Sequence, residues 1–280
     1  MRILQTIHEA RQARAAATGT IGLVPTMGAL HEGHLSLIRA AKKQCDVVAV
    51  SIFVNPTQFG PNEDFARYPR TFTADIALLE QEGVDLLFAP AVEEMYPDAA
   101  PRSAIEITAI EDRLDGHSRP GHFRGVATVV AKLFHIVSPE FAFFGQKDAA
   151  QVAVLRAMVD SLNFPVQLIV CPIVRDADGL ALSSRNRYLT AEERTDALAL
   201  SQSLDRAVTL ANKGVHDAEQ LRSALMAHLQ AVHTLTIDYV AIVNPHTLEP
   251  IADVRGGALL AIAAWLGKTR LIDNALLPPL

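Results

Sequence analysis

The cluster of side chains with the clearest chemical potential lies in residues 27–34, where Gly28, His31, Gly33 and His34 occur close together. The two glycines allow a tight turn or a close approach of the backbone to a ligand. We expect His34 to open a helix whose first N–H groups form an anion site, where both imidazoles could donate to phosphate oxygens. The alternative is a strand-to-helix turn that carries two solvated histidines, because short motifs match by accident. A zinc pair is disfavoured, since helical zinc ligands prefer i, i+4 spacing and no Cys or His cluster completes the site.

Two further candidate groups, Gln58 and Lys147, follow apolar runs later in the chain. Gln58 is either a loop amide that faces water or a neutral group that recognises hydroxyl and carboxylate oxygens. Lys147 is either a surface charge beside Asp148, which would then cap the following helix, or a compact cation for a phosphate group. Gln151 lies one turn beyond Asp148 and is expected to point toward the same edge of the fold.

A polar stretch that contains Ser183, Ser184 and Arg185 also has two interpretations. Two hydroxyls and a guanidinium are suited to a mobile phosphate clamp. The stretch is equally typical of a linker before a helix, because Thr190 and Glu193 have the spacing of a capping box. These residues alone do not decide between the two.

Repeated alternation of short apolar runs with segments of helical spacing predicts parallel βαβ units in the first part of the chain. Strands are expected at 21–24, 47–54, 84–88, 141–144 and 166–170, with helices between them. Later, helices at 191–211 and 217–232 are expected to precede strands at 237–243 and 258–264. The sequence therefore predicts an α/β fold, with a Rossmann-like doubly wound parallel sheet in residues 1–174 and a smaller C-terminal α+β domain in residues 175–280.

The polar clusters stand where predicted strands end, which indicates where a ligand would bind. In open parallel sheets, ligands bind beyond the carboxyl ends of the strands. Clusters follow the runs that end at Val24, Val54, Phe144 and Val174. We therefore expect these side chains to meet at one edge of the sheet.

Composition excludes several classes of protein. The chain has 280 residues, 50% of them hydrophobic and 20% charged, as in a folded globular protein. Lys and Arg number 25 against 31 Asp and Glu, so the net charge of -6 lacks the basic footprint that nucleic acid or an anionic membrane would attract. The two cysteines, Cys45 and Cys171, lie in apolar stretches and are interpreted as reduced core residues. The N-terminus reaches His8 and Glu9 before an apolar signal region can form, and the apolar stretch 258–266 is too short to span a bilayer, so we expect a cytoplasmic protein.

Taken together, the clusters resemble the HIGH-motif nucleotidyl transferase superfamily, and within it the pantothenate synthetase (pantoate–β-alanine ligase) family. The resemblance extends over nearly the whole chain, because several long matches occur in the family's order. The matching segments are 25–34 (PTMGALHEGH), 52–60 (IFVNPTQFG), 68–70 (YPR), 122–126 (HFRGV), 143–148 (FFGQKD), 183–186 (SSRN) and 269–274 (TRLIDN).

The resemblance implies an ATP-dependent ligase that makes pantothenate, a precursor of coenzyme A, in two steps. The carboxylate of (R)-pantoate attacks the α-phosphorus of ATP and expels pyrophosphate, and the amine of β-alanine then attacks the pantoyl adenylate to release AMP and pantothenate. Charge builds up on the phosphates in the first step, so positioning and preorganised cations matter more than covalent catalysis. The resemblance further implies Mg²⁺ carried by the phosphates and a homodimer, whereas the expectation of no nucleic-acid or membrane partner comes from the acidic composition.

The resemblance also assigns roles to residues. His34 acts on the triphosphate with His31 beside it, and Lys147 neutralises phosphate charge. Gln58 and Gln151 recognise pantoate. The residues expected to bind ATP are Met27, Gly28, Ala29, Leu30, His31, Glu32, Gly33, His34, Gly145, Gln146, Lys147, Asp148, Val174, Leu182, Ser183, Ser184 and Arg185.

Two positions depart from the family's pattern, and neither change removes a donor. Leu182 stands where the family usually has Met, a nearly volume-conserving exchange. Gln146 stands where the family often has Glu, so the charge beside ATP is slightly less negative. Asp75 is a possible Mg²⁺ ligand.

Two other functions remain open. One is a nucleotidyltransferase of the same superfamily that acts on a phosphorylated acceptor, although such an acceptor calls for more arginine than the neutral amides of Gln58 and Gln151 provide. The other is a catalytically silent nucleotide-binding protein, which would be expected to lack His34 or Lys147.

Overall fold

The computed structural model describes residues 1–61, 63–98 and 101–280 and divides into two compact units. The first unit contains Met1–Gly145 and Val154–Pro172, and the second contains Gln146–Ala153 and Ile173–Leu280. The segment that carries Lys147 thus belongs to the second unit. The chain then returns to the first unit and enters the second for good between Pro172 and Ile173, two residues before the expected boundary at 174/175. The assignment of separate roles to residues 1–174 and 175–280 stays a prediction.

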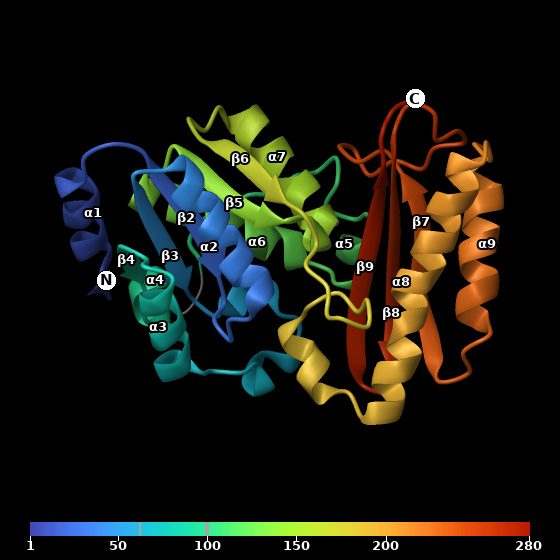
Figure 1. Ribbon diagram of the computed structural model, residues 1–280. Helices are drawn as coiled ribbons and strands as arrows, with labels where there is room; N and C mark the ends of the chain where they lie inside the picture. The colour runs from blue at the N-terminus through green and yellow to red at the C-terminus, as the bar shows by residue number, and fades with distance from the viewer. Residues whose placement is uncertain (62, 99–100) are drawn as a thin grey trace. The chain divides into compact units, whose positions relative to one another are not determined.

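The first unit is built on a six-stranded sheet in which every pairing is parallel. The strands lie in the order β1-β4-β3-β2-β5-β6 (Figure 1). Their bounds are β1 Arg2–Leu4, β2 Ile21–Thr26, β3 Val47–Ile52, β4 Leu86–Phe88, β5 Phe141–Gly145 and β6 Gln167–Cys171. Near-continuous apolar runs form the inner strands because helices cover both of their faces. The predicted doubly wound parallel sheet is confirmed.

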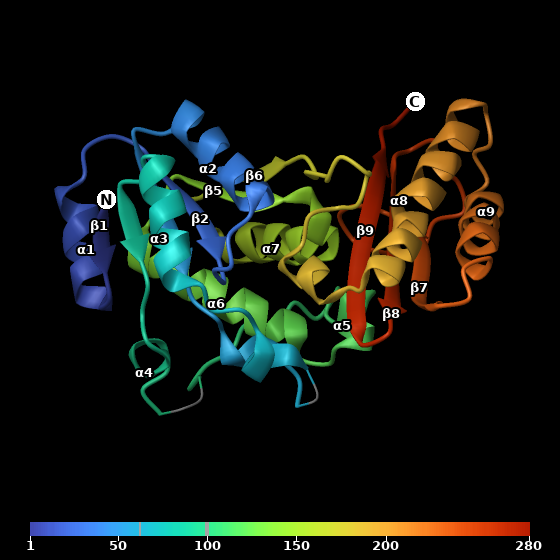
Figure 2. The same cartoon turned by 60° about the horizontal axis from the view of Figure 1, so that its bottom comes forward.

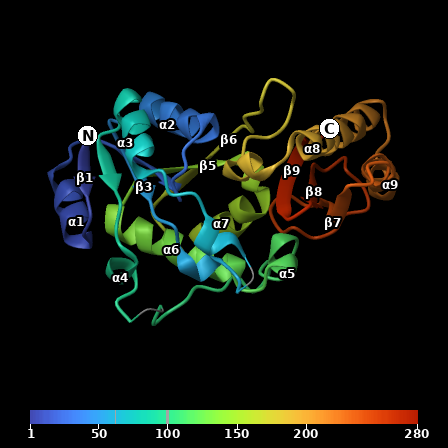
Figure 3. The ribbon, with the colours of Figure 1, turned by 90° about the horizontal axis from the view of Figure 1, so that it is seen from below.

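Helices lie on both faces of this sheet, with α2 and α3 on one side of the strands and α1 and α6 on the other (Figure 3). A buried core under α2 and α3 includes Val24, Ile38, Val50 and Leu79. The helices are α1 Ile7–Ala16, α2 Glu32–Gln44, α3 Phe72–Gln81, α4 Val92–Met95, α5 Asp115–Ser118, α6 His122–Val137 and α7 Ala149–Leu162, of which α7 begins in the second unit and ends in the first. Short 3-10 turns are η1 Pro56–Gln58, η2 Asp64–Arg67 and η3 Gln146–Asp148.

The chain reverses its direction of travel across the sheet between β2 and β5. From β2 it passes outward to β3 and β4, and it then returns to place β5 and β6 on the other side of β2. The β2–β5 ladder covers only Gly22–Leu23 and Phe141–Ala142, so the two strands part before their carboxyl ends. Such a reversal is where open α/β sheets bind ligands.

The second unit has a three-stranded antiparallel sheet, β7 Leu235–Val243, β8 Ala258–Leu266 and β9 Thr269–Leu277. Helices α8 Ala191–Asn212 and α9 Ala218–Gln230 lie together on one face of this sheet (Figure 2). Leu260, Ile262 and Ala264 alternate along β8 and pack into the core that both helices cover. Thr190 and Glu193 form the predicted capping box of α8, and the 3-10 turn η4 Ser184–Tyr188 precedes it.

The strands expected from apolar runs are all present, with ends that differ by at most two residues. The short β1 and the polar β9 were not expected as strands. One helix start was placed wrongly: α2 begins at Glu32 with His31 as its N-cap, so His34 lies inside the first turn instead of opening the helix. Both cysteines are free thiols, Cys171 buried and Cys45 partly so.

Candidate functional site

The loop after β2 has a tightly defined backbone. Gly28 and Ala29 both adopt positive φ, 80° and 50°, a region that is unfavourable for alanine. The carboxylate of Asp75, 2% exposed, accepts hydrogen bonds from the backbone N–H of Ala29 at 3.0 Å and of Leu30 at 2.9 Å. These bonds compensate the strain of the loop. Asp75 does not fit the expected Mg²⁺ ligand, because its buried oxygens already hold this backbone.

His31 and His34 form a reciprocal cap at the start of α2. Nδ1 of His31 accepts from the backbone N–H of Gly33 at 3.2 Å, and Nδ1 of His34 accepts from the backbone N–H of His31 at 3.3 Å. The ring centroids are 4.2 Å apart. Because Nδ1 accepts in both rings, the proton of each neutral imidazole lies on Nε2, the nitrogen that can donate to a ligand.

Glu32 carries an acidic side chain at the first position of α2, where the helix dipole favours a negative charge. Its carboxylate makes an ion pair with Arg39, which also bonds Glu82. The carboxylate of Glu32 is therefore paired on the helix surface. Among residues 27–34, the two imidazoles and the turn have the geometry to bind an anion.

Gln58 is held by a buried turn around Asn55, which is 1% exposed. Nδ2 of Asn55 donates to Oε1 of Gln58 at 3.0 Å, and its Oδ1 accepts from the hydroxyl of Tyr96 at 3.0 Å. The amide nitrogen of Gln58 then points to the sulfur of Met27, at 3.3 Å. The turn thus fixes which end of the Gln58 amide faces the loop after β2.

The start of α6 clamps the same turn from the other side. Nδ1–H of His122 donates to the backbone carbonyl of Gln58 at 2.9 Å, and its Nε2 accepts from Arg119 at 2.9 Å. A Cβ atom on Gly125 would lie only 2.3 Å from the carbonyl oxygen of Thr57, so glycine is required for this approach. The segment 122–125 therefore positions Gln58.

Burial, together with the charge of Arg119, keeps the ring of His122 neutral. Burial and the nearby Arg119 guanidinium lower the pKa of His122 to about 4. Arg119 also makes an ion pair with Glu63 at 2.6 Å. Burial opposes ionisation of that acid, but the hydrogen bond and charge of Arg119 keep the pKa of Glu63 below its ordinary value.

We expect the free energy of unfolding to decrease as the pH falls from about 6.5 toward 4, partly because of His122. Its pKa is about 4 in the folded protein and about 6.5 in the unfolded chain. Between these values the unfolded chain binds the extra proton, so acid favours unfolding, by about 3 kcal/mol at the lower end. His122→Asn should flatten this part of the profile in urea unfolding, whereas exposed His246→Asn should not. Parallel profiles for His122→Asn and the parent would contradict the assignment.

A cavity of about 270 Å³ adjoins the loop after β2 in the first unit. The residues that line it include Met27, Gly28, Val54, Arg70 and Asp75. The lining is mainly apolar, with the guanidinium of Arg70 as its positive group. A small, partly apolar anion would suit such a space.

In the second unit, Lys147 lies in the η3 turn that directly follows β5 in the chain. Its Nζ is 3.7 Å from Oδ1 of Asp148, and its side chain is 21% exposed. Gln151 is partly buried in the first turn of α7. Lys147 is thus a shielded cation with one weak ion pair, which differs from a fully solvated surface lysine.

The other predicted residues of the second unit lie beside the hairpin that the antiparallel bridge between Arg175 and Ala181 closes, and in the η4 turn that follows it. The backbone carbonyl of Val174 accepts from the N–H of Leu182 at 3.0 Å. Ser183 caps η4, and its hydroxyl accepts from the N–H of Arg185 at 3.3 Å. Ser183 and Lys147 line the same small cavity. Within this unit the structure brings Lys147 and Ser183, the first residue of the Ser-Ser-Arg turn, to one cavity.

Several residues that shape these sites were not singled out individually from the sequence. Asn55 could have been suspected, since Asn before Pro is typical of a turn that its side chain stabilises. His122 and Asn274 act through contacts between distant segments, for which sequence spacing gives no signal.

Within the described residues, no group of three or more His, Cys, Asp or Glu side chains is arranged to hold a metal. Mg²⁺ usually keeps several waters and binds through substrate phosphates with few protein ligands. The residues present therefore fit an Mg²⁺ ion carried by ATP. None of the described helices has both the length and the apolarity to cross a membrane.

The fold and these sites define a class of protein. The parallel sheet is doubly wound, and the helix start with the His-x-Gly-His sequence follows β2, beside the chain reversal. A shielded lysine follows β5 in the sequence. This combination is the one expected from the resemblance to the HIGH-motif nucleotidyl transferases.

Comparison with known proteins narrows the class. The family model for pantoate-beta-alanine ligase matches residues 2–276. A pantothenate synthetase of Acidobacterium capsulatum is 60% identical over 93% of this chain and 87% of its own, and one of Thermotoga neapolitana is 56% identical over 99% and 100%. The crystal structure of pantothenate synthetase from Thermus thermophilus has a TM-score of 0.94 and 47% identity, and the match covers 100% of both chains. The chain belongs to the pantoate–β-alanine ligase family.

A further solved relative carries ligands. The ligase from Francisella tularensis, described as complexed with beta-gamma ATP and beta-alanine, is 37% identical, with a TM-score of 0.81 over 99% of this chain and 97% of that one.

Proposed function

We propose that this chain condenses (R)-pantoate with β-alanine at the expense of ATP, giving pantothenate, AMP and pyrophosphate. The observation that carries the proposal is the pair of imidazoles that cap α2, joined to family membership over residues 2–276. In the first step, a pantoate carboxylate oxygen bonds to the α-phosphorus and the bond to pyrophosphate breaks. In the second, the amine nitrogen bonds to the acyl carbon, AMP leaves, and the nitrogen loses a proton.

His34 and His31 contribute donors at Nε2 to the phosphate oxygens, next to the N–H groups of the first turn of α2. The helix dipole adds positive potential at the same point. Residues 27–30, with Gly33, bring backbone close to the nucleotide, which only a turn of this shape permits. Glu32 contributes to the contact with the nucleotide through its position in the turn.

Lys147 neutralises charge that develops on the phosphates, and its neighbours Gly145, Gln146 and Asp148 contribute to the same ATP contact. Backbone around Val174 contacts adenine. Ser183, Ser184 and Arg185 clamp the phosphates, with Leu182 at the position that leads into their turn. These roles are supported by the shielding of Lys147 and by its shared cavity with Ser183.

Gln58 and Gln151 recognise pantoate through neutral amides. A hydroxy acid offers hydroxyl and carboxylate oxygens, which an amide N–H can bind without the full charge of a guanidinium. Hydrogen bonds from Asn55 and His122 fix Gln58 in one orientation, which supports its use in recognition.

We expect Gln58→Ala to raise the KM for pantoate by at least about 10-fold while the KM for ATP changes far less, because a lost hydrogen bond to a charged group is worth about 1.5–3 kcal/mol. Steady-state kinetics with each substrate varied in turn measures this. Gln44→Ala, an exposed change at the end of α2, is the matched control. Equal effects on both KM values would remove the assigned role.

The experiment that tests the function is ATP–pyrophosphate exchange with (R)-pantoate, with and without β-alanine. Exchange that depends on pantoate alone, and that turns into net release of AMP and pantothenate when the amine is added, would establish the two-step ligase. Exchange with a phosphorylated acceptor but not with pantoate would favour the nucleotidyltransferase alternative.

Mg²⁺, a homodimer and a cytoplasmic location complete the proposal. Exchange should stop with a chelator and return with added Mg²⁺. Light scattering should give twice the mass of the chain, and a monomer would refute the dimer. Cell fractionation tests the location.

A further inference from the structure

The polar pair Asp273 and Asn274 lies in the middle of β9, where apolar residues would be ordinary. Both residues are 3% exposed. They point to opposite faces of the sheet, because Asp273 pairs with Ile262 and Asn274 with Ala261 on β8. Buried polar groups are costly unless they are hydrogen-bonded, so their partners indicate what they are for.

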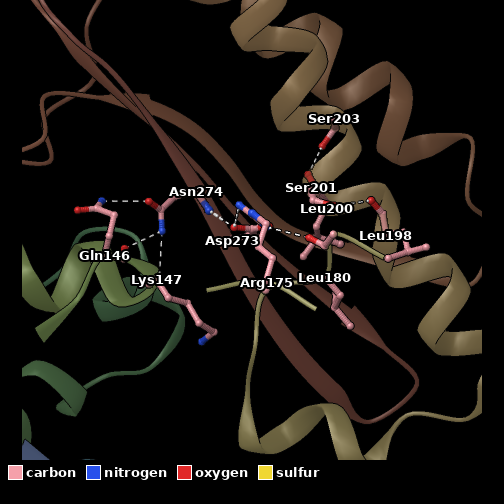
Figure 4. A network of polar contacts seen from close by, with 12 residues as sticks. Gln146, Lys147, Arg175, Leu180, Leu198, Leu200, Ser201, Ser203, Asp273 and Asn274 are labelled. Carbon is pink, nitrogen blue, oxygen red and sulfur yellow. Dashed lines mark hydrogen bonds and ion pairs between the residues drawn. The ribbon is translucent and has the colours of Figure 1, made fainter. Parts of the chain in front are cut away.

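Asn274 uses its whole side-chain amide to hold the η3 turn (Figure 4). Its Nδ2 donates to the backbone carbonyl of Gln146 at 3.0 Å and to that of Lys147 at 2.9 Å. Its Oδ1 accepts from Nε2 of Gln146 at 3.0 Å. These bonds join the backbone at Lys147 to a rigid strand.

Asp273 holds the hairpin that leads to the Ser-Ser-Arg turn. Its carboxylate accepts from both terminal nitrogens of Arg175, at 2.6 and 2.9 Å, and from the backbone N–H of Asn274 at 2.8 Å (Figure 4). Arg175 also donates to the carbonyl of Gly179 at 3.2 Å. Two adjacent residues of one strand thus anchor both segments.

We propose that Asn274 is a positioning residue for Lys147, and that Asp273 beside it holds the hairpin before Ser183 in register with that lysine. A lysine is a point charge on a flexible stem, so its value to a developing phosphate charge depends on where its backbone is fixed. Asn274 fixes that backbone through the carbonyl of Lys147 itself. The inference rests on the proposed role of Lys147 with ATP.

The test is Asn274→Asp. Aspartate has the same size and still accepts from Nε2 of Gln146, but it cannot donate and places negative charge against two carbonyl oxygens. We expect the rate of pantoate-dependent exchange to fall about 10- to 100-fold, since a displacement of about 1 Å can cost that much, with a smaller change in the KM for ATP.

Asn244→Asp is the matched control in the same unit. Oδ1 of Asn244 only accepts, from the backbone N–H of His246 at 2.8 Å and of Thr247 at 3.1 Å, and aspartate can do the same. This variant adds the same charge and should stay within about twofold of the parent.

A double-mutant cycle separates positioning from general damage. In a Lys147→Ala background, measured by single-turnover adenylation, Asn274→Asp should cost at most a fewfold, because the group that it positions is gone. An equal loss in both backgrounds, or a parental rate in the single variant, would overturn the proposal. If Asn274→Asp does not fold, Asn274→Ala takes its place in the same cycle and is judged by the same outcomes.

Failure of the proposed function can be distinguished from failure of this inference. Absence of pantoate-dependent exchange in the parent would refute the function itself. Exchange in the parent that is unaffected by Lys147→Ala would refute the lysine's role. A functional parent and a strongly slowed Lys147→Ala variant, with a normal Asn274→Asp variant, would refute this inference alone.

Discussion

Lys147→Ala is expected to slow formation of the pantoyl adenylate by at least about 10²- to 10³-fold, the loss typical of removing one preorganised group that stabilises developing negative charge. The lysine is partly shielded from solvent, which strengthens its interaction with a phosphate relative to a solvated lysine. Its weak contact with Asp148, at 3.7 Å, leaves the charge incompletely neutralised. Rapid-quench single-turnover kinetics with saturating ATP and pantoate measures the rate of this step.

Two companion variants test whether the charge itself is what matters. Lys147→Arg keeps the charge but presents a larger planar fork, so we expect a partial loss. Lys268→Ala, in the exposed turn between β8 and β9, removes a lysine from the same unit and should leave the rate unchanged. A nearly normal rate in Lys147→Ala would show that another group carries the phosphate charge.

Five strands of the first unit's sheet could be predicted because they are apolar runs between clear breaks, whereas the three-residue β1 is too short to give such a signal. β9 could not, because Arg270, Asp273 and Asn274 interrupt the apolar alternation that identifies a strand. The bonds of Asp273 to Arg175 and of Asn274 to Lys147 span more than ninety residues of chain, and they compensate the burial of both side chains. Contacts of that range are set by the tertiary structure and leave no local pattern.

The candidate site shows the same division between local sequence signals and contacts that only the tertiary structure sets. Residues 27–34 were identified from glycines and histidines at short spacing, which is a local signal. Asp75 was interpreted as a possible Mg²⁺ ligand, yet its carboxylate accepts hydrogen bonds from the backbone N–H groups of Ala29 and Leu30. Sequence alone indicates that a group is chemically capable, whereas its partners decide whether it meets the substrate or supports the loop that does.

His34→Ala is expected to slow adenylation by about 10²- to 10³-fold while the fold is kept. The ring has two separable tasks. Its Nδ1 accepts from the backbone N–H of His31 and so contributes to the cap of α2, whereas Nε2 is the donor for phosphate. Loss of the cap alone should cost about 1 kcal/mol of stability and little rate.

Two substitutions divide these tasks. His34→Asn keeps an acceptor near the position of Nδ1, so it should retain more of the stability than His34→Ala while losing as much rate. His34→Gln extends an amide N–H toward the position of Nε2 and should recover part of the rate, because a donor is again available at the phosphate. Urea unfolding and single-turnover adenylation on the same samples measure both quantities. If His34→Asn were as fast as the parent, the imidazole would serve only to cap α2, and the phosphate donor would have to come from His31 or from the N–H groups of the helix.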